Sequence, residues 1–278
     1  MNNDYHLTFA GADFATSPII FIRDDYHRQE NFRNEEELLE FIESIIQTHM
    51  IPGLSTVIVK NNSIVWENYF GYSNLNESIL VNEDSMFILS SISKTITATA
   101  LLQLYEDGLI NLDDNINDYL SFNVYNPNYP LSTITFKMLL SHVSSIKDNW
   151  SVMPYYNGDS DLELGYYLEQ YFTTGGLFFD NSSNFTNSIP GSEFNYSNIG
   201  AALIGFLVEE ISNQPFNEFC VENIFEPLNM DNTFWFLSEI DNIDSVAIPY
   251  QYQGGSGDSC FEIGCSLSWA CHSVFSFP

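Results

Sequence analysis

Two residues of the segment LSSISKTITATALLQLY, residues 89–105, have types and spacing suited to nucleophilic catalysis. Ser91 and Lys94 lie three positions apart, on one face of a helix, and Lys94 is the only charged residue between Ser85 and Tyr105. A serine hydroxyl needs a base nearby, and a lysine becomes one when burial disfavours its ammonium form. The spacing therefore predicts a Ser91 nucleophile activated by a buried Lys94. The alternative is a lysine that extends its stem from a packed helix into solvent.

The same S-x-x-K pattern occurs a second time, at Ser144-Ser145-Ile146-Lys147. This copy follows the end of an expected helix and precedes Asp148. We interpret it as a solvated turn. His142, just before it, is either a general base or a structural histidine in the turn, and we favour the structural role.

A second candidate element is Tyr196-Ser197-Asn198, which follows Pro190-Gly191 and precedes a helical pattern. A tyrosine here can relay a proton, and an asparagine can hold a substrate amide. The alternative for Asn198 is a helix cap.

The elements expected to position these residues are helices and one hairpin. The predicted hairpin turns at Asn61-Asn62, between two β-rich runs. The predicted helices begin at Glu35, at Asp84 or Ser85, at Asn198 and at Pro215. The helix that carries Ser91 should end near Asp107-Gly108 and is apolar on nearly every face, which predicts a buried helix.

Composition limits the classes of partner. The chain has 278 residues, 45% of them apolar, with 37 acids against seven Lys and Arg and a net charge of −30. Nucleic acids and anionic membranes need a cationic surface, so neither is expected as a partner. We find no transmembrane segment and no signal peptide, which favours an intracellular location by default.

Four cysteines occur, at positions 220, 260, 265 and 271, and none forms a C-x-x-C pair. The run that ends at His272 is a poor match to zinc spacings, so we expect free thiols, no metal and no cofactor. The sequence changes character from Gln251 onward, where small residues and three of the cysteines gather. We therefore predict a polar extension at 1–34, a main domain at 35–250 and a divergent tail of low structure at 251–278.

Together the S-x-x-K and Tyr-x-Asn patterns resemble the serine β-lactamase and penicillin-binding-protein superfamily. The Tyr-x-Asn form is similar to the class C branch and its esterase and D-aminopeptidase relatives. The segments TITFKMLLSHVSSIKD and FCVENIFEPLNMDNTFW also resemble family segments, with Ser145 and Asn229 where glycine is usual. The resemblance covers about residues 35–250.

The resemblance implies an α/β (α+β) fold of the β-lactamase/DD-peptidase kind, an antiparallel sheet flanked by helices plus a mostly helical lobe. It implies Ser91 as the acylated nucleophile, Lys94 as base, Tyr196 as proton relay and Asn198 as the residue that orients the substrate. The backbone N–H of Ser91 would be one oxyanion donor. The substrate would be a small molecule or peptide-like, an amide, ester or β-lactam. The sequence does not indicate an oligomeric state.

One family motif has no counterpart. The third motif, Lys-Thr-Gly or His-x-Gly, does not occur after Tyr196. The resemblance places it on a strand that also supplies the second oxyanion donor. Our alternative hypothesis is therefore a truncated, catalytically impaired or non-catalytic member, with a 54–70 hairpin that lacks its C-terminal strand partners.

Overall fold

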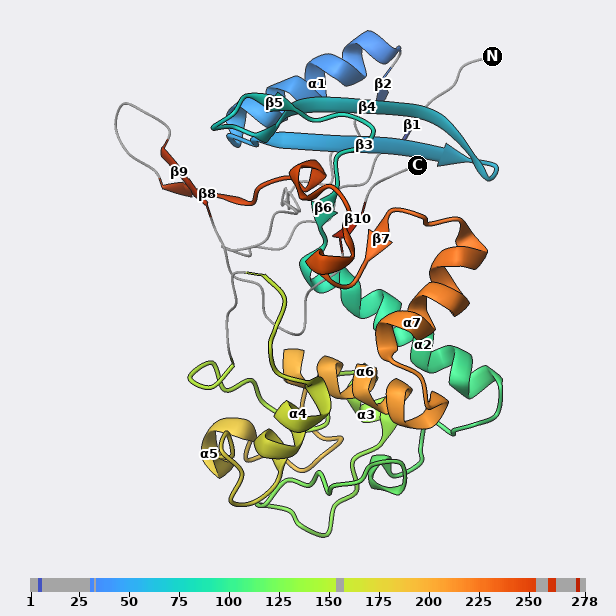
Figure 1. Ribbon diagram of the computed structural model, residues 1–278, viewed down its shortest axis with the longest axis vertical. Helices are drawn as coiled ribbons and strands as arrows, with labels where there is room; N and C mark the ends of the chain where they lie inside the picture. Colours follow the sequence, from blue (N-terminus) through green and yellow to red (C-terminus); the bar gives the residue numbers. More distant parts are fainter. Residues whose placement is uncertain are drawn as a thin grey trace. The chain divides into compact units, whose positions relative to one another are not determined.

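The structure is a computed structural model that describes residues 5–6, 31–32, 34–153, 158–253, 260–263 and 274–275 (Figure 1). The chain forms two compact units. Of the described residues, the first unit contains those within 1–88 and 242–265 together with Phe275, and the second contains those within 89–241 together with Val274.

The first unit begins its regular structure with helix α1, Glu35–Thr48. The Asn34 side chain accepts a hydrogen bond of 2.9 Å from the Glu37 backbone N–H and so caps the helix. Three glutamates occupy the first turn, where the positive end of the helix dipole stabilises them. The helix predicted from Glu35 is confirmed.

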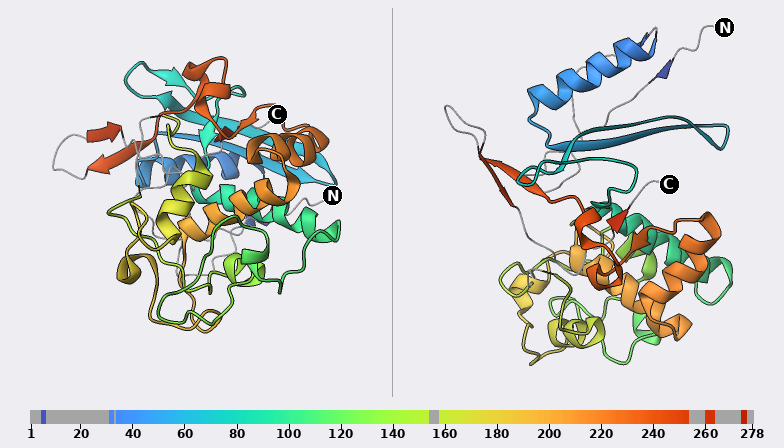
Figure 2. Two further views of the ribbon diagram at one scale, coloured as in Figure 1. Left: turned by 60° about the horizontal axis from the view of Figure 1, so that its bottom comes forward. Right: turned by 45° about the horizontal axis from the view of Figure 1, so that its top comes forward.

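The predicted hairpin is also confirmed. Strands β3, Gly53–Lys60, and β4, Ser63–Asn74, pair antiparallel with Lys60 opposite Ser63. Asn61 and Asn62 both have positive φ, 52° and 60°. A two-residue type I′ turn requires positive φ at both of its central residues. Helix α1 packs on this hairpin (Figure 2), and its Leu38 and Ile42 are buried there.

At the open end of the hairpin, the backbone at Pro52 lies so close to Gly71 that only glycine fits there. Gly71 has φ +68°, and a Cβ added to it would lie 2.2 Å from the Pro52 carbonyl oxygen. Any larger residue would force these strands apart. The other described strands of this unit are β1, Tyr5–His6; β2, Asn31–Phe32; β5, Ile79–Leu80; β6, Phe87–Ile88; β8, Tyr250–Gln253; and β9, Cys260–Ile263.

Most of the tail predicted from Gln251 lies outside the described residues. Its described parts include β8 and β9, which pair antiparallel with Gln253 opposite Cys260, and β10, Val274–Phe275. The predicted division into an extension, a main domain and a tail stays a prediction.

The second unit is mostly helical. Its helices are α2, Ser93–Glu106; α3, Phe136–Leu140; α4, Leu164–Phe172; α5, Asn181–Asn184; α6, Asn198–Ser212; and α7, Phe216–Cys220. A π-helical turn, Val221–Phe225, and a 3₁₀ turn, Glu226–Leu228, continue α7, and a short strand, β7, follows at Thr233–Phe234. The helices predicted at Asn198 and after Pro215 are confirmed.

Helix α6 is the centre of this unit. It packs against α2, α3, α4 and α7 (Figure 1). Its residues from Asn198 to Val208 are all buried, which explains why the sequence of this helix is apolar without a polar face. The large buried side chains around it include Leu101, Phe136, Tyr167 and Leu168. One buried core thus holds both helices, α2 and α6, that carry or directly follow the candidate site residues.

Two expectations for α2 are wrong. The helix begins at Ser93 rather than at Asp84 or Ser85, because the backbone near Met86 is extended and bonds to a distant segment. The Met86 N–H donates to the Ser245 carbonyl over 2.8 Å, and the Ala247 N–H donates to the Met86 carbonyl over 2.7 Å. Burial is also one-sided, since the Leu102 and Tyr105 side chains are 38% and 44% exposed.

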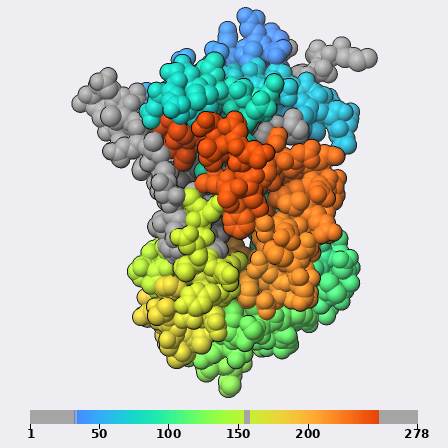
Figure 3. All heavy atoms as spheres, viewed as in Figure 1, coloured from blue at the N-terminus to red at the C-terminus, as the bar shows by residue number. Residues whose placement is uncertain are grey.

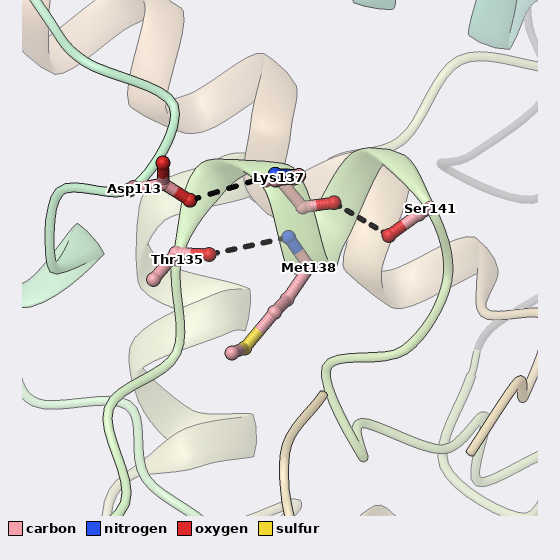
Figure 4. A network of polar contacts seen from close by, with 5 residues as sticks. All are labelled: Asp113, Thr135, Lys137, Met138 and Ser141. Carbon is pink, nitrogen blue, oxygen red and sulfur yellow. Dashed lines mark hydrogen bonds and ion pairs between the residues drawn. The ribbon is translucent and has the colours of Figure 1, made fainter. Parts of the chain in front are cut away.

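Helix α3 is a short helix fixed at both ends by side chains (Figure 4). The Thr135 hydroxyl accepts from the Met138 N–H over 3.3 Å, and the Ser141 hydroxyl donates to the Lys137 carbonyl over 2.6 Å. Lys137 also lies 3.9 Å from Asp113, an exposed ion pair that adds little stability. These caps set the start of the segment 142–148 that follows.

At two positions this sequence has another residue where the family usually has glycine, and both residues have a left-handed backbone conformation. Ser145 has φ +65° and Asn229 has φ +54°, a region that glycine adopts at least cost. The positive φ explains why glycine would suit each position.

No helix in the described part of the chain combines the length and the apolar character that a membrane crossing requires. Among the same residues, no group of three or more His, Cys, Asp or Glu side chains could hold a metal ion. Cys220 is a buried free thiol, and burial raises its pKa to about 12.

Candidate active site

The site begins at the N-terminal end of α2. Ser91 lies in a 3₁₀ turn, Ser90–Ile92, that leads directly into the helix. The preceding Ser90 has φ +52°, an uncommon conformation for a residue with a Cβ. Backbone N–H groups at such an end have no partner within the helix and favour negative charge, so the turn suits an oxyanion as well as a nucleophile.

Lys94 follows one turn later. Its Nζ lies 3.4 Å from Ser91 Oγ, within hydrogen-bond reach but at the long end of the range. The side chain is half-buried, not buried as the sequence predicted, because α2 is exposed on one side. The structure therefore brings Ser91 and Lys94 together, as their spacing predicted.

Tyr196 completes the group from a distant part of the sequence. Its hydroxyl donates to Ser91 Oγ over 3.1 Å, across a sequence separation of 105 residues. Lys94 Nζ also lies 5.3 Å from the centre of the Tyr196 ring, a cation–π distance. Hydroxyl, amine and phenol thus meet at one point, with Ser91 exposed and the Tyr196 side chain 42% exposed.

His142 also contacts Tyr196. The two rings lie 4.6 Å apart between centroids, and His142 Nδ1 accepts from the Ser197 backbone N–H over 3.3 Å. A ring nitrogen that accepts is unprotonated, so the proton of a neutral imidazole here is on Nε2. Burial lowers the pKa of His142, the charge of Lys94 lowers it further, and Asp148 opposes both. The structural role that the sequence favoured for His142 stays a prediction.

Asp148 anchors the first turn of α6. Its carboxylate accepts from the backbone N–H groups of Asn198, over 3.1 Å, and Ile199, over 3.0 Å. It also accepts from the Ser197 hydroxyl over 3.2 Å. A carboxylate at this end of a helix satisfies unpaired donors and complements the dipole. Because Tyr196 directly precedes this turn, Asp148 helps to fix the position of the phenol.

Asn198 lies in the same turn, and its side chain is hydrogen-bonded to Asp148. Its side-chain Nδ2 donates to Asp148 over 2.8 Å, and the residue is 8% exposed. It is part of helix α6, whose N-terminal cap is the Ser197 hydroxyl, bonded to the Gly200 N–H over 2.9 Å. Asn198 follows Tyr196 by two residues, and its amide nitrogen is directed to Asp148.

The second S-x-x-K copy is not the solvated turn that the sequence predicted. Ser144 and Ser145 are 3% and 2% exposed, and Ile146 is fully buried. Asn126 Nδ2 donates to Ser145 Oγ over 3.0 Å and so fixes this segment to the core. The prediction failed because Ile146 and its neighbours pack inward, which a polar local sequence does not reveal.

Sequence reasoning missed Asp148 as a site residue. The sequence separation between Asp148 and the turn it caps is 50 residues, so no local capping pattern links them. Only a general indication was available. The unpaired backbone N–H groups at the start of α6 need a hydrogen-bond acceptor, and an acidic residue on a neighbouring segment can supply one.

Comparison with known proteins identifies the family of this chain. Residues 34–259 match the family model described as Beta-lactamase. The chain belongs to the beta-lactamase family. This match confirms the superfamily of serine β-lactamases and penicillin-binding proteins that the two motifs indicated.

The curated relatives are longer than this chain. Protein flp of Staphylococcus aureus (strain MRSA252) is 26% identical over 223 residues, which are 80% of this chain and 42% of flp. Penicillin-binding protein 4* of Bacillus subtilis (strain 168) is 26% identical over 220 residues, 78% of this chain and 46% of that protein. The chain therefore spans less than half the length of these relatives.

Solved structures confirm the fold class. An octameric penicillin-binding protein homologue from Pyrococcus abyssi has a TM-score of 0.69 at 24% identity, covering 87% of this chain and 53% of its own. The D-amino acid amidase from Ochrobactrum anthropi SV3, in complex with D-phenylalanine, has a TM-score of 0.66 at 21% identity, covering 86% and 68%. The family member described here thus has the mixed α/β fold that the resemblance implied.

Proposed function

We propose that this chain carries the acyl-transfer centre of a serine hydrolase. Ser91 Oγ would bond to the carbonyl carbon of an amide, ester or β-lactam and give up its proton to Lys94 or Tyr196. The proton would pass to the leaving nitrogen or oxygen as its bond to carbon breaks. Water would then release the acyl group from Ser91.

One observation carries this proposal: two proton-transfer groups contact one serine hydroxyl. Tyr196 reaches Ser91 Oγ at 3.1 Å and Lys94 reaches it at 3.4 Å, from two different elements of the helical unit. A serine needs such a partner to become a nucleophile, and a positioned acid–base group contributes on the order of 10²–10⁴ in rate.

The remaining roles follow from position. We propose the Ser91 backbone N–H, at the start of α2, as one oxyanion donor. We propose Asn198 as the residue that orients the substrate, through its side-chain oxygen, since its nitrogen bonds to Asp148. The proposed mechanism needs no metal or cofactor. The proposed substrates are small or peptide-like acyl donors.

The test is covalent labelling of the whole chain with a fluorophosphonate and with a fluorescent penicillin, followed by mass spectrometry of the labelled peptide. We expect the label on Ser91. Ser91→Ala should lose it, whereas Ser144→Ala, the matched serine of the second S-x-x-K copy, should keep it. A label that persists in Ser91→Ala would move the nucleophile elsewhere.

A second candidate function is a non-catalytic role on the same fold. The observation that favours it is the lack of a Lys-Thr-Gly or His-x-Gly triplet among the residues after Tyr196. Loss of one oxyanion donor costs on the order of 10²–10³ in rate. A folded chain that takes up neither label would support this alternative.

A further inference from the structure

A large cavity lies in the helical unit, apart from the serine group. Its volume is about 800 Å³, and residues 158–165, helix α6 and the turn 213–217 line it. Figure 3 shows a hollow between the yellow-green atoms around residue 160 and the orange atoms of the α6–α7 segment. Sites for small molecules have volumes of roughly 300–1,000 Å³. Ser91, Lys94 and Tyr196 are not among the lining residues, so acyl transfer does not account for this cavity.

Small residues and aromatic side chains together line the cavity. Ala201, Ala202 and Gly205 line it from α6, and the Phe216 ring packs against Gly205, 3.8 Å from where a Cβ would lie. Phe216 and Trp235, with ring centroids 4.8 Å apart, face it together with Phe206 and Phe236. Such walls fit the apolar body of a ligand of aromatic size.

The charged residues of the cavity have one sign. Its acidic lining residues are Asp159, Asp161, Glu163, Glu209 and Glu210, and none of the described residues that line it is Lys, Arg or His. Asp159 is already committed, because its two oxygens accept from the Leu237 and Ser238 N–H groups at 2.8 Å each.

Glu209 is the carboxylate placed to meet a ligand. It is half-buried on α6, and its Oε1 accepts one hydrogen bond of 2.9 Å, from the Phe216 N–H. Burial raises its pKa, the hydrogen bond from the Phe216 N–H opposes this, and the charges of Glu210 and Glu163 add to the rise. A cation bound here would therefore meet a desolvated carboxylate with two acidic neighbours, beside aromatic faces that also attract cations.

We propose that this cavity binds an organic ammonium that carries an aromatic or similar apolar body. The ammonium would pair with Glu209, and the body would lie against the aromatic wall beside Ala201 and Ala202. A metal ion fits less well, because no group of three or more His, Cys, Asp or Glu among the described residues could hold one, and a metal ion would leave the aromatic wall without a partner.

The test is calorimetric titration of the whole chain with three probes of similar size: 2-phenylethylammonium, neutral 2-phenylethanol and anionic 3-phenylpropanoate. We expect saturable binding of one ammonium ion and affinities for the other two that are lower by about tenfold or more, the equivalent of one charge interaction. The affinity for the ammonium ion should fall as the pH is lowered, because Glu209 then takes up a proton and loses its charge.

Glu209→Gln should lower the affinity for 2-phenylethylammonium by about tenfold. The amide oxygen can still accept from Phe216, and a thermal melt reports whether the variant is folded. Glu169→Gln, an exposed glutamate of α4 outside the cavity, is the matched control and should bind as the unchanged chain does. Ser91→Ala should also bind unchanged, which separates this proposal from the proposed hydrolase function. Equal binding of 2-phenylethanol, full affinity in Glu209→Gln, or no saturable binding of the ammonium ion would each overturn the proposal.

Discussion

The two S-x-x-K copies of this chain have the same spacing and opposite environments. In the first, Ser91 is exposed at the start of a helix and both of its partners are side chains, Lys94 and Tyr196. In the second, Ser144 is buried and its hydroxyl accepts from the Ile146 backbone N–H over 3.4 Å. Lys147 contributes mainly its backbone, which donates to the Asn184 carbonyl and accepts from the Tyr171 hydroxyl.

The difference shows what a short motif leaves undecided. Spacing brings a serine and a lysine onto one face only where the backbone is helical through both. The 91–94 segment passes from a 3₁₀ turn into α2, whereas the 144–147 segment contains Ser145 at φ +65° and is not helical. The second copy lies between His142, which contacts Tyr196, and Asp148, which anchors the turn after it.

Removal of the two lysine amines should give the largest contrast between the copies. Lys94→Met should lower the rate of acylation by a fluorophosphonate by about 10²–10⁴, because Ser91 loses its adjacent proton acceptor. Lys147→Met, whose amine is exposed, should change the rate by less than about twofold. A stopped-flow labelling assay measures both. Equal losses would mean that the first copy has no special role.

Tyr196→Phe should have a smaller but clear effect. It removes the hydroxyl that lies 3.1 Å from Ser91 and keeps the ring against His142 and Lys94. We expect acylation to slow by about 10² with the melting temperature unchanged, at the lower end of acid–base contributions because Lys94 remains. If the hydroxyl only packs, the rate should not move.

Asp148 and Asp113 offer a matched pair for stability. Asp148→Asn weakens charge-assisted bonds to the α6 turn and should lower the free energy of unfolding by about 1–3 kcal/mol in a urea titration. Asp113→Asn removes only an exposed ion pair with Lys137 and should cost less than about 0.5 kcal/mol. Similar losses for the two variants would contradict the anchoring role of Asp148.

His142 should give the smallest effect, a pH dependence of stability. Its pKa is lower in the folded chain, so as the pH falls below the unfolded value of about 6.5 the unfolded chain binds the proton first. The free energy of unfolding should therefore be unaffected above that pH and decrease until the folded pKa is passed. Asn tolerates the φ of +54° at this position, so His142→Asn should stay folded.

Urea titrations of both chains at a series of pH values isolate this contribution. The difference between them should flatten above about pH 6.5 and change below it. The charged and phenolic groups that face the imidazole, Lys94, Asp148 and Tyr196, are present in both chains and cancel in the comparison. A difference that does not vary with pH would show that the pKa of His142 is the same in the folded and unfolded chains, which would contradict this prediction.

The local features of the fold were predictable and the long-range ones were not. The hairpin at Asn61-Asn62 and helix α6 follow from turn chemistry and periodicity, which act within a few residues. The predicted start of α2 was wrong because the Met86 backbone forms hydrogen bonds with Ser245 and Ala247. No local sequence pattern indicates partners so distant in the chain.

The site divides in the same manner. The contact of Ser91 with Lys94 followed from their spacing, and the approach of Tyr196 followed from the family resemblance. The half-burial of Lys94 and the anchor at Asp148 depend on how helices pack, because burial and capping across 50 residues are properties of the tertiary structure.

The Asp148 anchor also has a consequence for the order of folding. The first turn of α6 gains its acceptor only after a loop of about 50 residues has closed, which costs entropy before the contact forms. The middle of α6 can nucleate earlier against neighbouring helices, so its amide protons should become protected from exchange first. The Asn198 and Ile199 amides should follow later, and Tyr196 should reach Ser91 only in that last step.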